Sequence, residues 1–315
     1  QCLMLYSLGF AYSKIGMDMQ CNSQSVKNVM LINSVTEKMV AVRHTNGTDV
    51  WVILHGWRSD LFYSFLITCG GIQSQPVVSQ ASPVFAPGSG ALASNNALGQ
   101  MAASPDGTML ATGHYLSGFV HVYNFDAATG QVTNRMSFQG RNEPPNNFLS
   151  TNGIYGVSFS PNSRFLYTLC GFCGNKYSQF DLQAGGGIVA AVQASQDVIT
   201  TRQSALQLGP DGRLYSTQPN ASFLHVVPQP NSAGFTGNYT ANAVSLSFRS
   251  NRVGGLPGFV TNYFEPGDDE IIGDSIICPG TDTVVYAMPK SSCIDSMAWT
   301  YVGPGTILLE QDNQI

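Results

Sequence analysis

A four-residue turn sequence recurs four times in this chain, and each copy separates two apolar runs. The spacing between its Asn or Asp positions is 60 (46 to 106), then 56 (106 to 162), then 49 (162 to 211). A self-similar unit of this length, built from short strands and turns, is typical of a β-propeller. The four copies are His44-Thr45-Asn46-Gly47, Ser104-Pro105-Asp106-Gly107, Ser160-Pro161-Asn162-Ser163 and Gly209-Pro210-Asp211-Gly212.

The chemistry of these turns favours hairpins. Glycine adopts positive φ without a Cβ clash, and Asp or Asn hydrogen-bonds to its own backbone. Proline presets one turn dihedral and stops the preceding strand. The third copy has Ser163 where the others have glycine, so we expect its turn to be less ideal. The predicted structural turn residues are Asn46, Gly47, Asp106, Gly107, Asn162, Asp211 and Gly212.

Three apolar runs accompany each turn, and their alignment makes four unrelated turns the weaker interpretation. The runs before the turns are 39–42, 99–102, 155–159 and 205–208. Those after them are 50–53, 109–112, 165–168 and 214–217, and the closing runs are 62–66, 120–125, 177–182 and 223–227.

The pattern predicts an all-β chain in two parts. The first, 1–268, is an incomplete β-propeller of six to seven blades when complete, with partial blades at both ends. Its four full repeats lie near 30–86, 87–147, 148–198 and 199–240. Residues 274–315 contain an alternating run at 283–288 and, further on, Trp299, and they resemble the beginning of an Ig- or PKD-like sandwich, which needs about 100 residues to close.

The composition of the chain excludes some classes of function. Only 10% of the residues are charged, against about 25% in ordinary soluble domains. The net charge of −5 and the lack of a basic run argue against nucleic-acid binding. No apolar stretch is long enough to span a membrane. A polar but weakly charged surface fits an extracellular or assembly-forming protein.

Several segments resemble the large cell-surface proteins of Bacteroidetes-type bacteria. The matching segments are 37–47 with 51–55, 155–161, 206–212 and 255–260. The resemblance implies an N-terminal WD40/YVTN-like propeller, then PKD- or Ig-like repeats and a gliding-motility-type sorting domain read by type IX secretion. This chain lacks the family's first blade segments and its C-terminal domain. It is therefore expected to be part of a longer polypeptide, or to be completed by another chain.

Seven cysteines leave at least one unpaired within the chain. The candidate disulfides are Cys170–Cys173, Cys278–Cys293 and Cys2–Cys21, which would leave Cys69 over. Cys170-Gly171-Phe172-Cys173 could also be a redox dithiol, but no helix start accompanies it to lower a thiol pKa.

No enzyme or metal motif is evident. The five histidines show no ligand spacing, and we expect His121 and His225 to cover strand surfaces. Five acidic residues could provide the oxygen ligands of a weak calcium site, although a solvated acidic linker is the favoured interpretation of this segment. Its residues are Glu265, Asp268, Asp269, Glu270 and Asp274. No cofactor and no catalytic residues are predicted.

These features favour a non-enzymatic, secreted cell-surface protein that presents its propeller for adhesion, self-assembly, or binding of protein partners or glycans. One alternative is a lactonase-like propeller hydrolase, and fold alone does not decide activity. Another is a filament protomer completed by strand donation from a neighbour. Trp51 is predicted to pack blade against blade, and Leu256, Phe259 and Phe264 to anchor a closing strand.

Overall fold

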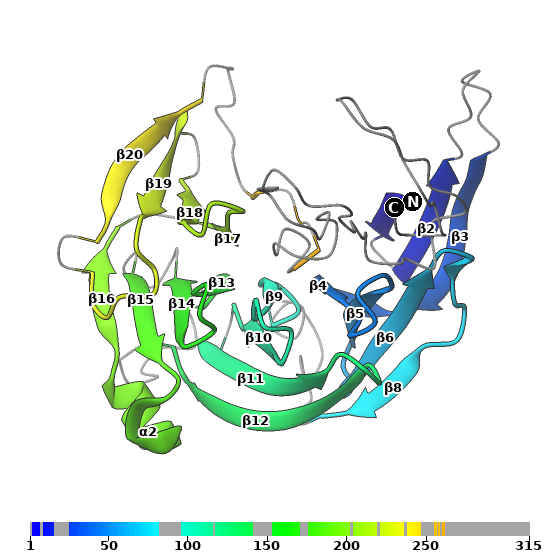
Figure 1. Ribbon diagram of the computed structural model, residues 1–315, viewed down its shortest axis with the longest axis horizontal. Helices are drawn as coiled ribbons and strands as arrows, with labels where there is room; N and C mark the ends of the chain where they lie inside the picture. The colour runs from blue at the N-terminus through cyan, green and yellow to red at the C-terminus, as the bar shows by residue number, and fades with distance from the viewer. Residues whose placement is uncertain are drawn as a thin grey trace, which may run out of the picture.

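The fold is known from a computed structural model. The structure describes residues 2–6, 9–15, 25–81, 96–115, 117–140, 153–170, 176–201, 204–218, 221–235, 238–246, 255–256, 258 and 260–261. Within these ranges about 56% of the residues are in β-strands and almost none are in helices, so the all-β class is confirmed. Strands follow one another in sequence and pair antiparallel, forming five sheets arranged around a common centre (Figure 1).

The first sheet has three strands and the second has five. The first comprises β1 (Cys2–Tyr6), β2 (Gly9–Ile15) and β3 (Ser25–Asn33). The second comprises β4 (Val35–Arg43), β5 (Val50–Gly56), β6 (Leu61–Thr68), β7 (Gly71–Ile72) and β8 (Val77–Gln80).

The remaining three sheets have four strands each. The third comprises β9 (Met101–Ala103), β10 (Met109–Gly113), β11 (Phe119–Asp126) and β12 (Gln131–Gln139). The fourth comprises β13 (Gly156–Phe159), β14 (Phe165–Cys170), β15 (Lys176–Asp181) and β16 (Asp197–Thr200), with η1 (Ala184–Gly186) and the short helix α2 (Val189–Ala194) before β16. The fifth comprises β17 (Leu206–Leu208), β18 (Leu214–Thr217), β19 (Phe223–Val227) and β20 (Thr240–Ser245).

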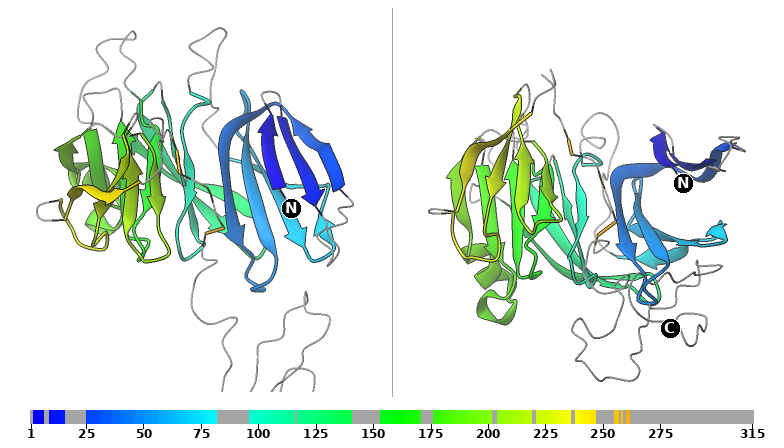
Figure 2. Two further views of the ribbon diagram at one scale, coloured as in Figure 1. Left: turned by 90° about the horizontal axis from the view of Figure 1, so that it is seen from above. Right: turned by 45° about the horizontal axis from the view of Figure 1, so that its top comes forward.

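The last four sheets form a four-blade propeller arrangement. Their innermost strands β4, β9, β13 and β17 contact one another in that order. Figure 2 shows the blades standing side by side, with the β1–β3 sheet beside β4. Each apolar run predicted beside a turn overlaps one of these strands, although the runs 99–102, 155–159, 177–182 and 205–208 extend one or two residues beyond theirs. β3 crosses residue 30 and β20 extends past residue 240, so these strands do not end at the predicted repeat bounds.

The hairpin turns follow their sequence chemistry. Gly107 has φ of 71°, and the Asp106 carboxylate accepts the Thr108 N–H at 3.0 Å. In the third turn Ser163 takes φ of 58°, a left-handed conformation that costs a non-glycine residue energy. This turn is therefore less ideal, as its sequence predicts.

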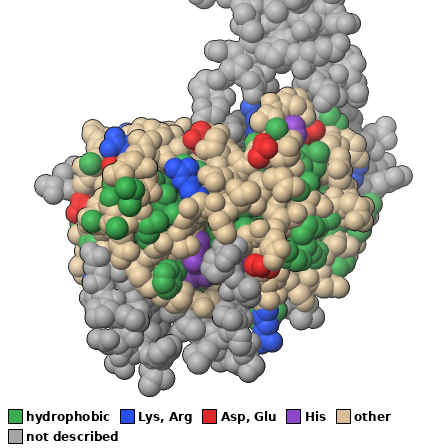
Figure 3. All heavy atoms as spheres, turned by 90° about the horizontal axis from the view of Figure 1, so that it is seen from below, with side chains coloured by type: hydrophobic (Ala, Val, Ile, Leu, Met, Phe, Trp, Pro, Cys, Tyr) green, Lys and Arg blue, Asp and Glu red, His purple; other side chains and the backbone are tan. Residues whose placement is uncertain are grey.

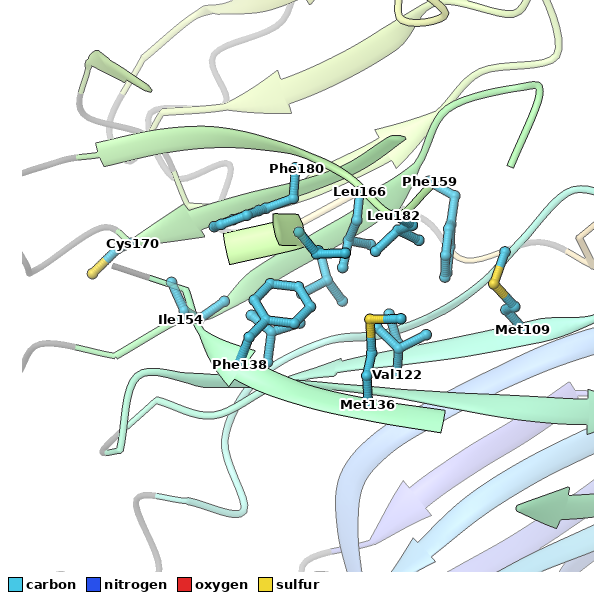
Figure 4. Close-up of a cluster of buried hydrophobic side chains, with 14 residues drawn as sticks. Met109, Val122, Met136, Phe138, Ile154, Phe159, Leu166, Cys170, Phe180 and Leu182 are labelled. Atoms are coloured by element: carbon cyan, nitrogen blue, oxygen red, sulfur yellow. The ribbon is translucent and has the colours of Figure 1, made fainter. Parts of the chain in front are cut away.

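Apolar clusters lie between neighbouring sheets. The cluster between the third and fourth sheets includes Phe138, Met136 and Val122 facing Phe180 and Leu166 (Figure 4). Strands in the middle of a blade are buried on both faces, as β14 is along its whole length. Blade-on-blade packing therefore supplies the apolar burial that holds the fold together.

Some predictions concern regions that the structure does not describe. The sandwich segment 274–315 and the calcium candidates Glu265, Asp268, Asp269, Glu270 and Asp274 lie outside the described residues, as do Phe259 and Phe264. A full count of six to seven blades also stays a prediction. Among the helices of the described ranges, none has the length and apolarity to cross a membrane.

A candidate active site in the central cavity

A cavity of about 850 Å³ lies where the inner strands of the four blades converge. Leu256, Gly258, Val260 and Thr261 also line it. The Thr261 N–H donates to the Ala41 carbonyl at 2.9 Å, next to a parallel bridge with Val42 of β4. The C-terminal part of the described chain therefore contributes to the cavity wall.

The two ends of the cavity differ in chemistry. Three prolines, Pro105, Pro161 and Pro210, follow the ends of inner strands and line one end. The other end is polar because Glu37 and Tyr155 lie near the starts of inner strands. This polar end is the candidate site.

Glu37 is the central group of the polar end. Its exposed side chain accepts the Gly99 N–H at 2.6 Å, and its carboxylate lies close enough to Tyr155 to act on the pKa of that phenol. Burial and the neighbouring carboxylate both raise the pKa of Tyr155, so its phenol stays protonated at neutral pH. The pair thus consists of an oriented carboxylate and a neutral hydroxyl donor.

Gln100 connects three blades at the same end. Its backbone N–H donates to the Tyr155 carbonyl at 2.8 Å. Its side-chain oxygen accepts the Leu206 N–H at 3.1 Å, and its side-chain nitrogen donates to the Leu206 carbonyl at 3.3 Å. These bonds fix the distances between the strand starts that border the site.

Lys38 lies behind Glu37 and is completely buried. Its Nζ donates to the carbonyls of Asn96, Ala97 and Leu98 at 3.1, 3.1 and 2.9 Å. Burial lowers the pKa of Lys38 to about 7, and the charge of Glu37 opposes this shift.

Three histidines are buried beside Lys38, between the second and third sheets. His55, His114 and His121 have exposed fractions of 0%, 2% and 6%. The rings of His114 and His121 are 4.5 Å apart, and His121 Nδ1 is 2.5 Å from Ser137 Oγ. Burial first, and then the charge of Lys38, lowers the pKa of all three.

The burial of His121 corrects the expectation that His121 and His225 cover strand surfaces. His225 is buried as well, with Nδ1 2.9 Å from the Tyr239 hydroxyl, and burial lowers its pKa. A strand in the middle of a blade is packed against other sheets on both faces. Alternate side chains of such a strand can therefore all be buried. No group of three metal-binding side chains occurs within the described ranges.

The predicted cysteine pairs need revision. Cys69 and Cys170 are both disulfide-bonded. Cys69 was the residue that the three predicted pairs leave over, so those pairs cannot all form together. The side chains of Cys2, Cys21, Cys173, Cys278 and Cys293 lie outside the described part of the chain.

Charged side chains are sparse on the surface. Figure 3 shows most of one face covered by backbone and neutral polar side chains, with isolated cationic and anionic groups. This agrees with the charged fraction of 10%.

No family model and no curated protein matches this chain. Solved structures with a similar fold include a periplasmic gluconolactonase from Pseudomonas aeruginosa, at 14% identity and a TM-score of 0.46, covering 76% of this chain and 64% of that one. A protein from Lactobacillus plantarum is 15% identical, with a TM-score of 0.46 and coverage of 75% and 65%. A candidate 6-phosphogluconolactonase from Bacteroides uniformis is 16% identical, with a TM-score of 0.41 and coverage of 60% and 49%. The chain spans less than two thirds of the length of each of these proteins.

These neighbours correct the main functional expectation. Proteins named as lactonases occur among them, whereas none of those reported is named as a non-enzymatic surface protein, so the expectation of a non-enzymatic cell-surface role is not upheld. The lactonase-like alternative is taken up below as a proposal. Nothing in the comparisons supports adhesion, type IX secretion, gliding or filament assembly. The resemblance to surface proteins is supported only as far as the propeller-like fold. Likeness at this identity concerns the fold alone, so the reaction is argued below from residues.

Proposed function

We propose that this protein is a hydrolase that opens a small cyclic ester at the polar end of the central cavity. The observation that carries the proposal is the geometry of Glu37, whose carboxylate borders the cavity, is oriented by the Gly99 N–H, and lies near the Tyr155 phenol. A carboxylate held in this way is suited to general-base catalysis, which needs a basic group aimed at a water molecule.

The reaction needs only water as a co-reactant. Glu37 takes a proton from water while the water oxygen attacks the ester carbonyl carbon. The carbonyl oxygen becomes an oxyanion. The Tyr155 hydroxyl lines the same end of the cavity and donates its single O–H to this oxyanion once Glu37 is protonated. Collapse of this intermediate breaks the ring C–O bond, and the leaving oxygen takes the proton back from Glu37. A hydroxy acid is the product, and Glu37 returns to its starting state.

An uncharged lactone fits this site better than a phosphorylated one. Glu37 places a negative charge on the cavity wall, and a phosphate close to it would be repelled. D-Glucono-1,5-lactone is therefore the first substrate to test, and 6-phosphogluconolactone is the comparison. Both choices follow the names that two of the structural neighbours carry.

The test is acid release from each lactone in a pH-stat, with spontaneous hydrolysis subtracted. Glu37→Gln keeps the shape of the side chain and removes the base, so we expect a loss of 100-fold or more, on the order of a general-base contribution. Tyr155→Phe should lose less. Asp60→Asn is the matched control, because Asp60 lies outside the cavity and hydrogen-bonds Gln80. Equal rates for Glu37→Gln and wild type, with equal melting temperatures, would refute the proposal.

An extracellular or periplasmic location is part of this proposal. The disulfides at Cys69 and Cys170 support it, because such bonds persist in oxidising compartments. Thiol labelling of the denatured natural protein, without reductant, tests this location. Labelling at Cys69 and Cys170 would contradict it.

A further inference from the structure

We propose that Lys38 is a positioning residue for this site, whose buried ammonium holds residues 96–98 in place and whose loss of a proton loosens the polar end of the cavity. The inference rests on the proposed function for its effect on catalysis. Its structural part can be measured without any activity.

Two adjacent side chains of β4 hold one short backbone segment. Lys38 binds the carbonyls of residues 96–98, and Glu37 binds the N–H of Gly99. Glu37 lines the cavity, whereas Lys38 is completely buried and does not line it, so the two side chains leave β4 in different directions. Four consecutive residues, 96–99, are thus held by two adjacent side chains of one strand.

The segment held by Lys38 leads directly into the site. Gly99 is the hydrogen-bond partner of the Glu37 carboxylate, and the next residue, Gln100, binds Tyr155 and Leu206. Lys38 itself does not line the cavity. It therefore acts on the site only through the backbone of residues 96–98.

The three bonds depend on the protonation state of Lys38. An ammonium has three N–H donors, and each one has a carbonyl acceptor here. A neutral amine has only two donors, and its lone pair would face the third carbonyl oxygen. Deprotonation must therefore release one of the three carbonyls.

Proton loss is favoured by the surroundings of Lys38. Burial lowers its pKa to about 7, while Glu37 on the same strand raises it. The titratable groups coupled to it from neighbouring elements are His55 of β5, His114 after β10 and His121 of β11. Each of these has a lowered pKa and is neutral at pH 7, so none adds a positive charge when Lys38 titrates.

The test combines NMR with kinetics on wild type, Lys38→Met and Lys38→Arg. Lysine Cε resonances are followed from pH 5 to 9, together with amide hydrogen exchange at Gly99 and, as a control, at Leu166 in β14. We expect one lysine to titrate near pH 7 in wild type and not in Lys38→Met. Above that pH, Gly99 should lose at least tenfold more protection than Leu166.

In the kinetic arm, kcat/KM for gluconolactone should fall about tenfold per pH unit above pH 7 in wild type. Lys38→Arg keeps its charge at all these pH values and should abolish this fall, since arginine does not deprotonate. A Lys38 signal that does not titrate below pH 9, or unchanged Gly99 protection across its titration, would overturn the inference. Absence of lactone hydrolysis, with the titration and the change in protection intact, would instead refute the proposed function.

Discussion

Gln100 forms two hydrogen bonds with the backbone of Leu206, 106 residues further along the chain. The side-chain amide acts like a paired strand residue, because it accepts the N–H and donates to the carbonyl of the same residue. It joins the third sheet to the fifth across the start of the fourth. Gly156 lies beside this link, with its Cβ position only 3.3 Å from Gln100 Oε1.

Gln100→Leu should lower the free energy of unfolding by about 1–3 kcal/mol, because both polar groups of Leu206 lose their partner. Urea melts measure the loss. Gln207→Leu is the matched control on β17, since its amide makes only a 3.5 Å contact with Leu208. A control loss equal to that of Gln100→Leu would show that the link between blades adds nothing.

Gly156→Ala tests the space beside the link. A Cβ at this position would be 3.1 Å from Leu169 Cβ and 3.3 Å from Gln100 Oε1. We expect a loss of about 1–3 kcal/mol from crowding. Gly258→Ala should be neutral in the same denaturation assay, because a Cβ there meets no atom of the described residues within 4 Å. If Gly156→Ala has the same free energy of unfolding as wild type, the Gln100 side chain moves away from the added methyl group at no cost, which would contradict the prediction.

Trp51→Ala should cost about 3–5 kcal/mol. The indole is 5% exposed, and its Nε1 donates to the Ala127 carbonyl at 2.9 Å, so it packs one blade against the next. Trp57→Ala is the control because Trp57 is only half-buried. Chemical denaturation measures both variants, and a cost below about 1 kcal/mol for Trp51→Ala would contradict the packing role.

The buried histidines make stability depend on pH. The folded pKa of His121 is lowered to about 4, below its ordinary value of 6.5. Between these values the unfolded chain binds a proton that the folded chain does not, so stability falls as the pH falls below 6.5. The slope for one such group is about 1.4 kcal/mol per pH unit.

His121→Gln should remove the uptake of about one proton on unfolding, so the pH dependence of the unfolding free energy should fall by about 1.4 kcal/mol per pH unit. Denaturation midpoints at pH 7, 6 and 5 for both proteins measure it. Parallel curves for the variant and wild type would show that His121 does not titrate differently in the two states.

The propeller could be predicted because its signals are local. Asp106-Gly107 and Asp211-Gly212 determine turns through their own backbone chemistry, and the apolar runs beside them become strands. The third turn was predicted to be less ideal for the same reason, and Ser163 has the expected positive φ.

The candidate site could not be predicted because its contacts are distant in sequence. Lys38 binds residues 58 to 60 positions away, and Gln100 binds one 106 positions away. No spacing in the sequence marks such pairs. In the sequence, Glu37 and Lys38 resemble an ordinary pair of charged residues on a strand. Only the folded structure shows that both side chains bind residues 96–99.

Binding of the product tests the central claim most directly. A crystal structure of the protein soaked with D-gluconate should show the ligand at the polar end of the cavity, within hydrogen-bond distance of Glu37 and Tyr155. Gluconate bound at another place, or an empty polar end at saturating concentration, would contradict the assignment of this cavity as the active site.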